Sequence, residues 1–253
     1  MIKVVICGAL GRMGMMIGSI VVKDPDMELV GGVDMHAGEF FGAPVVPPEG
    51  FADLLAEKRP DVVIDFTVAA ASEKNIPVAA AAGSAIILGT TGLSASQRAA
   101  IDDAITRAGV PAVISSNYSI GMNILWILVR EAARNLGEYD VEVTEAHHRY
   151  KKDAPSGTAK TILEILQREI GPREEVYGRE GMTERGNEIG VHVIRGGDIV
   201  GDHSVIFTAN HETVTLSHQA YDRGVFAEGA IKATKWLVGK KPGIYGMKDV
   251  LGL

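Results

Sequence analysis

Apolar residues in the first half of the chain form short continuous runs separated by stretches with helical spacing. The strand-like runs cover residues 2–6, 28–34, 62–66, 85–88 and 111–115. Between them, apolar positions recur every three or four residues, as they do at Met13, Met16, Ile17 and Ile20. Further helices are predicted over residues 51–58 and, after a Ser94–Gln97 capping box, up to about residue 108. Apolar strands alternating with helices predict a doubly wound (Rossmann-like) α/β domain with a parallel sheet.

The pattern changes after Asn117. A helix predicted over residues 120–136 ends at Gly137, which we expect to cap it in a left-handed conformation. Alternating residues up to His147 predict a strand, and a further helix has an apolar face at Ala159, Ile162, Leu163 and Leu166. Three more alternating runs cover residues 191–194, 204–208 and 213–220. They predict a smaller α+β domain whose sheet is covered on one face, followed by a last helix at about 225–237.

A glycine-rich turn follows the first strand directly. Residues 8–14 read GALGRMG, and backbone N–H groups at such a strand–helix turn can hold a pyrophosphate. The spacing is G-x-x-G-x-x-G rather than the usual dinucleotide fingerprint, so an ordinary tight turn is the alternative. Asp34 ends the second strand twenty residues beyond Gly14, where a carboxylate can accept hydrogen bonds from ribose hydroxyls. The turn and Asp34 together predict a dinucleotide, whereas Asp34 alone is only a strand-end residue.

Two further segments follow strands at the same edge of the predicted sheet. They read GTTG at residues 89–92 and SSNY at residues 115–118, and either is a ligand-binding loop or a plain turn. The carboxylate of Asp34 repels a 2′-phosphate, and the next residue is Met35 rather than a basic residue. We therefore expect NADH to bind at least as well as NADPH, although His36 can soften the preference.

Composition and charge exclude several classes of protein. The 253 residues contain 25 Lys and Arg against 32 Asp and Glu, a net charge of −7, which argues against nucleic acid or an anionic membrane as the main partner. No apolar run approaches the roughly 20 residues of a membrane-spanning helix, and the first residues lack a signal-peptide pattern. We expect a cytoplasmic globular protein in which the single cysteine, Cys7, is buried.

A basic segment interrupts this acidic chain. Residues 145–159 read EAHHRYKKDAPSGTA and bring together His147, His148, Arg149, Lys151 and Lys152. This local positive charge suits an anionic substrate, and Ser156, Gly157 and Thr158 open a helix whose first N–H groups can face a carboxylate. The alternative is a solvated loop with an ordinary N-cap. We predict no metal, because adjacent histidines do not converge easily on one ion. The other histidines near strands (His192, His203, His211, His218) are assigned structural roles.

A charged, glycine-containing loop over residues 171–190 is of the length that is usually functional or mobile.

Several of these motifs together resemble one enzyme family. GRMG at residues 11–14, DFT at 65–67, GTTG at 89–92, the string from Glu145, and GDIVGDH at 197–203 occur in the same order as in 4-hydroxy-tetrahydrodipicolinate reductases. That family, long called dihydrodipicolinate reductase, belongs to the diaminopimelate route to lysine. The resemblance implies a dinucleotide domain over residues 1–118 completed by 229–253, and a substrate-binding and oligomerisation domain over 119–228. It also implies a homotetramer built through the sheet of the second domain.

The resemblance implies roles for individual residues. Cofactor contacts are expected from Gly8, Ala9, Leu10, Gly11, Arg12, Met13, Asp34, Gly89, Thr90, Thr91, Ser115, Ser116, Asn117 and Tyr118. The substrate dicarboxylate is expected to contact His148, Lys151, Ser156, Gly157 and Thr158, and the acid–base residues are expected to be His147 and Lys151. Members of the family often carry a basic residue where this chain has Met35, which argues against strong NADPH use.

The implied chemistry agrees with these residue types. Reduction with NADH or NADPH places a hydride on a ring carbon, and the resulting enamine needs a proton, which histidine or lysine can supply. We favour Lys151 as the donor, with His147 orienting the substrate; the sequence leaves the choice open. The alternative of a semialdehyde dehydrogenase would need a catalytic cysteine. The single cysteine, Cys7, precedes the glycine turn on the first strand, which is the wrong place for a nucleophile that attacks the substrate. A dinucleotide-sensing regulator would need a nucleic-acid or protein-binding module, and no basic recognition helix is predicted.

Overall fold

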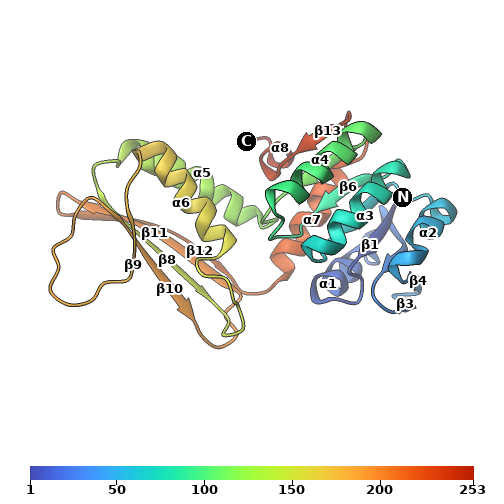
Figure 1. Ribbon diagram of the computed structural model, residues 1–253, viewed down its shortest axis with the longest axis horizontal. Coiled ribbons are helices and arrows are strands. Elements are labelled where there is room, and N and C mark those ends of the chain that lie inside the picture. The colour runs from blue at the N-terminus through green and yellow to red at the C-terminus, as the bar shows by residue number, and fades with distance from the viewer. The chain divides into compact units, whose positions relative to one another are not determined.

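The computed structural model describes all 253 residues, which divide into two compact units. The first unit comprises residues Met1–Ile120 and Arg223–Leu253, and the second comprises Gly121–Asp222. Figure 1 shows the ribbon of both units, coloured from blue at the N-terminus to red at the C-terminus. None of the helices combines the length and the apolar character needed to cross a lipid bilayer.

The first unit is built on an eight-stranded sheet in the order β13-β7-β6-β5-β1-β2-β4-β3. The strands are β1 (Ile2–Cys7), β2 (Met27–Val33), β3 (Gly38–Phe40), β4 (Ala43–Val46), β5 (Val62–Asp65), β6 (Ala85–Leu88), β7 (Pro111–Ile114) and β13 (Gly243–Tyr245). All neighbours pair in parallel except β3 and β4, which form an antiparallel hairpin at one edge. Because β1 lies between β2 and β5, the chain winds in opposite directions from this strand, and a crevice at its carboxyl end is the usual ligand site.

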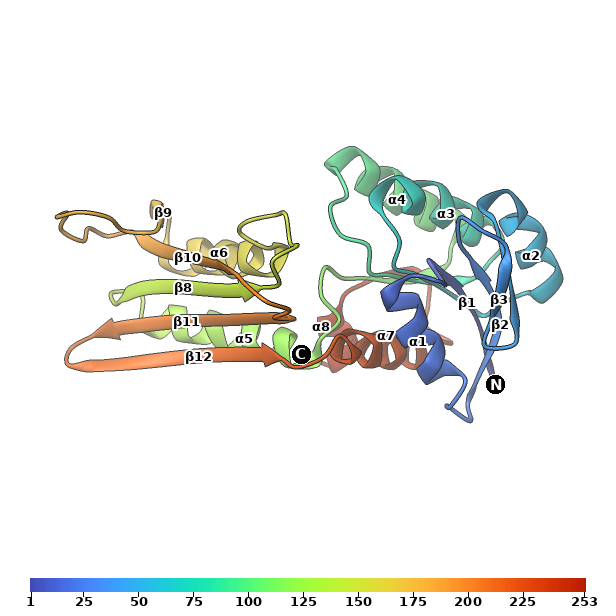
Figure 2. The ribbon, with the colours of Figure 1, turned by 90° about the horizontal axis from the view of Figure 1, so that it is seen from below.

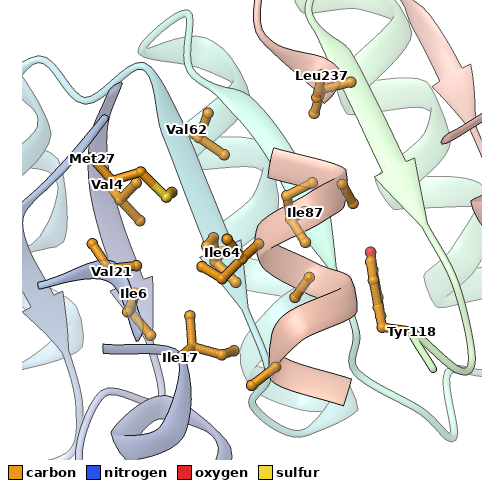
Figure 3. Close-up of a cluster of buried hydrophobic side chains, with 14 of the residues drawn as sticks. Val4, Ile6, Ile17, Val21, Met27, Val62, Ile64, Ile87, Tyr118 and Leu237 are labelled. Atoms are coloured by element: carbon orange, nitrogen blue, oxygen red, sulfur yellow. The ribbon is translucent and has the colours of Figure 1, made fainter. Parts of the chain in front are cut away.

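Helices cover both faces of this sheet. They are α1 (Arg12–Val21), α2 (Phe51–Lys58), α3 (Ala69–Ala81), α4 (Ala95–Ala108), α7 (Gly224–Leu237), α8 (Met247–Leu251) and the 3-10 helix η1 (Pro48–Gly50). Figure 3 shows one face, where Ile6, Ile64 and Ile87 from three strands pack with α1 and α7. Val5 and Val63 point to the opposite face, against α2, α3 and α4. The predicted doubly wound α/β fold is confirmed.

Three parts of the first unit were not predicted as separate elements: the β3–β4 hairpin with η1, helix α3, and the C-terminal β13 and α8. Helix α3 is rich in alanine and contains Pro77, so its sequence carries almost no apolar periodicity. It is nevertheless well packed, since Ile76, Ala79 and Ala80 are buried. In the C-terminal tail, β13 adds a strand beside β7 and α8 contributes Met247 and Val250 to the same core as α7.

The second unit is a five-stranded sheet in the order β12-β11-β8-β10-β9, covered by two helices. Its elements are α5 (Ile120–Asn135), β8 (Asp140–His147), α6 (Gly157–Ile170), β9 (Glu175–Tyr177), β10 (Ile189–Arg195), β11 (Gly201–Ala209) and β12 (Glu212–Ala220). β9 and β8 both run parallel to β10, whereas β11 is antiparallel to β8 and β12 (Figure 2). Val143, Leu166 and Phe207 lie in the core between the sheet and the helices, which confirms a second, smaller domain of mixed α and β structure.

The expected left-handed cap at Gly137 is wrong. Helix α5 ends at Asn135, and Gly137 is not among the glycines with positive φ. Its carbonyl oxygen accepts a hydrogen bond from the guanidinium of Arg173, and the N–H of Leu136 still donates to the carbonyl of Ala132, as in a continuing helical turn.

The loop over residues 171–190 is held against the sheet by side-chain contacts. It contains β9, and Arg185 donates to the carboxylates of Asp140 and Glu142 and to the carbonyl oxygens of Val141 and Glu188. The loop is therefore part of the second unit's edge.

Candidate active site

The glycine turn joins β1 to α1 in a conformation that suits a dinucleotide phosphate. Gly8 has φ of 78°, and the N–H groups of Gly8 and Ala9 both donate to the carbonyl of Val33 on β2, at 2.8 and 3.2 Å. A Cβ atom at Gly14 would stand 2.1 Å from the carbonyl oxygen of Gly8, so only glycine allows α1 to begin this close to the strand. The N-terminus of α1 therefore lies close to the carboxyl end of β1, which is where folds of this class bind a pyrophosphate.

Asp34 lies beside this turn. Its Oδ2 accepts a hydrogen bond from the backbone N–H of Leu10 at 2.8 Å, and its Oδ1 accepts one from Met35 at 2.8 Å. The carboxylate is therefore fixed in orientation, with further lone pairs available to hydroxyl groups. The next residue, Met35, is 73% exposed. Because its side chain is uncharged, this position places no positive charge beside Asp34.

A buried carboxylate, Asp65, holds the two neighbouring loops together. It accepts hydrogen bonds from the backbone N–H and hydroxyl of Thr67, from the hydroxyls of Ser72 and Thr90, and from the amide of Asn75, at 2.7 to 3.0 Å. The DFT and GTTG motifs, which are separate in the sequence, are thus linked through one side chain. This linkage fixes the loops that follow β5 and β6 at the ligand-binding edge of the sheet.

In the segment after β7, the side chain of Ser116 is exposed, whereas that of Ser115 is engaged within the segment itself. The Oγ atom of Ser115 donates to the carbonyl of Asn117 and accepts from its N–H group. The ring of Tyr118 is only 1% exposed, and its hydroxyl donates to carbonyl oxygens of Leu88 and Val113. Any cofactor contact of Tyr118 must therefore come from its main chain, as it must for the buried Ala9.

In the second unit, the basic segment starts on strand β8. Val141, Val143, Glu145 and His147 share the helix-covered face because side chains alternate along a strand, and Glu145 and His147 are both buried. The Nδ1 atom of His147 lies 2.5 Å from Oε2 of Glu145. A hydrophobic strand therefore ends in a buried carboxylate–histidine pair.

Glu145 is surrounded by hydrogen-bond donors. The two terminal nitrogens of Arg195 bind its two oxygens at 2.9 and 2.8 Å, and the N–H of Ser156 donates to Oε1 at 2.9 Å. Burial raises the pKa of Glu145, but the hydrogen bonds from His147, Arg195 and Ser156 outweigh it and lower the pKa to about 2. Glu145 is consequently a carboxylate at neutral pH.

His203 lies against the same pair from strand β11, where it is the cross-strand partner of Glu145. Its ring centroid is 5.1 Å from that of His147, and its Nε2 lies 3.2 Å from Oγ of Ser156. Burial and the neighbouring His147 lower the pKa of His203 to about 3, so its ring is neutral near pH 7. The structure thus places His203 within the site rather than in a separate structural position.

The loop between β8 and α6 carries the other predicted residues. Nζ of Lys151 forms an ion pair with Asp153 at 2.9 Å, with the lysine side chain 23% exposed. Ser156 caps α6 by accepting the N–H of Ala159, so the helix N-terminus opens at Gly157, with Thr158 in its first turn. His147, Lys151, Ser156, Gly157 and Thr158 therefore belong to one local arrangement, which suits the binding of a carboxylate.

Glu145, His147 and His203 also form the only set of three close metal-ligating groups in the chain, with donor atoms within 4.8 Å of one another. Both oxygens of Glu145 are already bound by the positively charged Arg195, which repels a cation. The three residues form part of a hydrogen-bonded network in which the charge of Arg195 disfavours a cation.

The sequence did not indicate the roles of Glu145, Arg195 and His203. The spacing Glu145-x-His147 in a predicted strand is a usable signal, because it places both side chains on one face. Arg195 lies 50 residues from Glu145, and only the pairing of β8 with β10 brings it close.

The fold of the first unit, together with the second, smaller domain, is that of a pyridine-nucleotide-dependent oxidoreductase. Two family models match the chain: "Dihydrodipicolinate reductase, N-terminus" over residues 2–118 and "Dihydrodipicolinate reductase, C-terminus" over residues 121–251. The chain belongs to the dihydrodipicolinate reductase family.

Individual relatives agree with this assignment. The chain is 73% identical to the 4-hydroxy-tetrahydrodipicolinate reductase of Methanospirillum hungatei and 65% identical to that of Methanoculleus marisnigri, in both cases over the full length of both chains. Among solved structures, the dipicolinate-bound dihydrodipicolinate reductase of Paenisporosarcina sp. TG-14 superposes with a TM-score of 0.81. That comparison, at 24% identity, covers 98% of this chain and 99% of the other, and it shows the shared fold.

Proposed function

We propose that this protein reduces 4-hydroxy-tetrahydrodipicolinate to tetrahydrodipicolinate with NADH or NADPH, in the diaminopimelate route to lysine. The observation that carries the proposal is the joint placement of His147, Lys151 and the α6 N-terminus in a chain of this family. Such an arrangement can bind a ring dicarboxylate and also supply the proton that the reduction consumes. The close relatives carry the name of the same activity.

The chemistry divides into binding and proton transfer. Loss of water from the 4-hydroxy compound gives a conjugated ring imine, and a reduced nicotinamide supplies the hydride that adds to a ring carbon. The backbone N–H groups at the start of α6, from Gly157, hold one substrate carboxylate together with Ser156 and Thr158. His148 adds a further polar contact to the dianion. Lys151 protonates the resulting enamine, while His147 orients the ring.

The cofactor is held by the first unit. The glycine turn from Gly8 to Met13 receives the pyrophosphate, and Asp34 accepts the adenosine ribose hydroxyls. The loops after β6 and β7, with Gly89, Thr90, Thr91, Ser115, Ser116, Asn117 and the main chain of Tyr118, contact the nicotinamide half. Close packing at Gly14 supports this assignment, because a larger residue there would open the turn.

The assignment of Lys151 is tested by the Lys151→Ala variant. Oxidation of NADH and NADPH is followed at 340 nm while a synthase generates the substrate from pyruvate and aspartate semialdehyde. We expect kcat to fall by about 100-fold or more, since general acid catalysis contributes roughly 10²–10⁴. The matched control is Lys152→Ala, which removes the adjacent lysine and should leave kcat within about twofold.

Two outcomes would contradict the proposal in different ways. Absence of turnover by the wild-type enzyme with either cofactor would refute the substrate assignment. Loss of substrate affinity at unchanged kcat in Lys151→Ala would refute Lys151 as the proton donor and leave the reaction itself in place.

A homotetramer is part of the proposal. The helices of the second unit cover one face of its sheet, whereas Thr213, Thr215, Ser217 and Gln219 lie exposed on β12 at its edge. The uncovered face and this long edge strand are surfaces on which further copies can pack. Light scattering after size exclusion should give about four times the 26.9 kDa of one chain, and a monomer mass would refute the tetramer.

A further inference from the structure

We infer that Glu145, clamped by Arg195, is a positioning residue that holds His147 in the tautomer with the proton on Nδ1, so that Nε2 is the nitrogen presented to the substrate. This inference deepens the proposed function and rests on it only for its kinetic arm. No motif in the sequence assigns such a role to Glu145 or Arg195.

The geometry around the Glu145 carboxylate decides which atom carries the proton. Three of its four hydrogen bonds come from groups that can only donate: the N–H of Ser156 and the two terminal nitrogens of Arg195. A protonated Glu145 would have to point its own hydrogen at one of these donors or at His147. With the carboxylate ionised, the 2.5 Å contact to His147 requires the proton to sit on Nδ1.

The opposite side of the His147 ring is shaped by Gly201 on β11. A Cβ atom at this position would stand 3.1 Å from Nε2, which is closer than most carbon contacts allow. The glycine therefore keeps space beside the nitrogen that the tautomer leaves open. His203 contacts the same ring edge-on at 5.1 Å between centroids and limits its rotation.

Arg195 also connects this pair to the loop that carries Lys151. Its Nη2 atom donates to the carbonyl of Asp153 at 2.6 Å, and the side chain of Asp153 binds Lys151. The backbone N–H of Ser156 donates to Glu145 at the other end of the same loop. One carboxylate–guanidinium pair thus sets the position of both proposed acid–base residues.

The first arm of the test is spectroscopic and needs no substrate. Solid-state NMR of protein labelled with ¹³C and ¹⁵N at histidine reports the tautomer of each neutral ring, and the His147 signals are assigned by their loss in His147→Gln. We expect wild type to show the Nδ1–H form, at a pH where the ring is neutral. In Glu145→Gln, the amide can donate to Nδ1, so the Nε2–H form should become populated. An Nε2–H ring in the wild type would overturn the inference.

The second arm is kinetic. Glu145→Gln should lower kcat by about 10- to 100-fold while the KM for NADH changes less than twofold, because the substituted residue is in the second unit and the cofactor residues are in the first. Glu145→Asp keeps the carboxylate and should recover part of kcat. Unchanged kcat in Glu145→Gln, together with an unchanged tautomer, would also overturn the inference.

The chain contains a matched control in Glu142→Gln. Glu142 lies on the same strand but on the other face, and its carboxylate contacts a histidine, His192, at 2.7 Å in a similar pair. This variant should keep both kcat and the His147 tautomer. The thermal transition of Glu145→Gln shows whether this variant folds. If it does not fold, Glu145→Asp and Arg195→Lys are used for the test instead. Arg195→Lys is then expected to show an altered His147 tautomer or a lowered kcat. A wild type without turnover would refute the proposed function, and the spectroscopic arm would still decide the tautomer.

Discussion

Single residues set the cofactor preference proposed for this enzyme. Asp34 is held by the backbone N–H groups of Leu10 and Met35, so it cannot easily rotate away from an added phosphate. We expect NADH to be used at least as well as NADPH. Met35→Arg places a guanidinium at this exposed position and should raise kcat/KM for NADPH by about tenfold relative to NADH.

The control for this prediction is Met35→Gln, which is similar in size but uncharged, and it should leave the ratio of the two kcat/KM values close to that of the wild type. A wild type with a large NADPH advantage would refute the role given to Asp34.

His203 should make the stability of the protein depend on pH. Its pKa is lowered from 6.5 to about 3 by burial and by His147, so below pH 6.5 the unfolded chain binds a proton that the native state does not. The contribution of neutral His203 to the free energy of unfolding is fully present above pH 6.5. It is lost as the pH falls toward 3, by up to about 1.4 kcal/mol per pH unit. Urea unfolding between pH 5 and 7 should therefore show a smaller pH dependence in His203→Gln. The same dependence in wild type, His203→Gln and the exposed control His36→Gln would contradict this.

At the scale of elements, Asp65 joins the loops after β5 and β6. Replacing Asp65 by Asn exchanges one carboxylate oxygen for an N–H₂ group, which then faces the hydrogen-bond donors that the oxygen had accepted from. At least one buried hydrogen bond is therefore lost, and a donor is left unpaired. We expect Asp65→Asn to lower the free energy of unfolding by about 2–3 kcal/mol and to weaken NADH binding. Asp102→Asn, at a surface ion pair with Arg98, should change stability by less than about 0.5 kcal/mol. Equal effects of both variants in urea unfolding would argue against the bracing role of Asp65.

The elements also show what the sequence could predict. Strands β6 and β7 are continuous apolar runs, and β1 and β5 are apolar apart from Lys3 and Asp65; the burial of these strands on both faces follows from that pattern. Helix α3 was missed because its buried face consists largely of alanine and small polar residues. In the site, His147 and Lys151 were predicted from their chemistry and family motif, and their roles remain a proposal. Arg195 could not be found, because its approach to Glu145 depends on the register of β8 with β10.

At the scale of the whole molecule, the first unit depends on packing between distant parts of the chain. Gly229 in α7 lies against the segment after β7, and a Cβ atom there would stand 1.8 Å from the carbonyl oxygen of Tyr118. Gly229→Ala should therefore destabilise the protein by about 3 kcal/mol, which thermal unfolding can measure. Gly38→Ala is the control, because a Cβ atom at Gly38 meets no atom within 4 Å. Equal melting temperatures for the two variants would contradict this packing.

The first unit cannot be completed until the last residues of the chain are synthesised, because α7, β13 and α8 all belong to it. The second unit is one uninterrupted stretch, so it can finish folding while the first unit still lacks α7, β13 and α8. During that interval the edge of β7 and the apolar face that α7 will cover are open to other nascent chains. A substitution that slows docking of α7 would therefore lower the yield of folded enzyme during synthesis, while each molecule that matured kept its full catalytic constants.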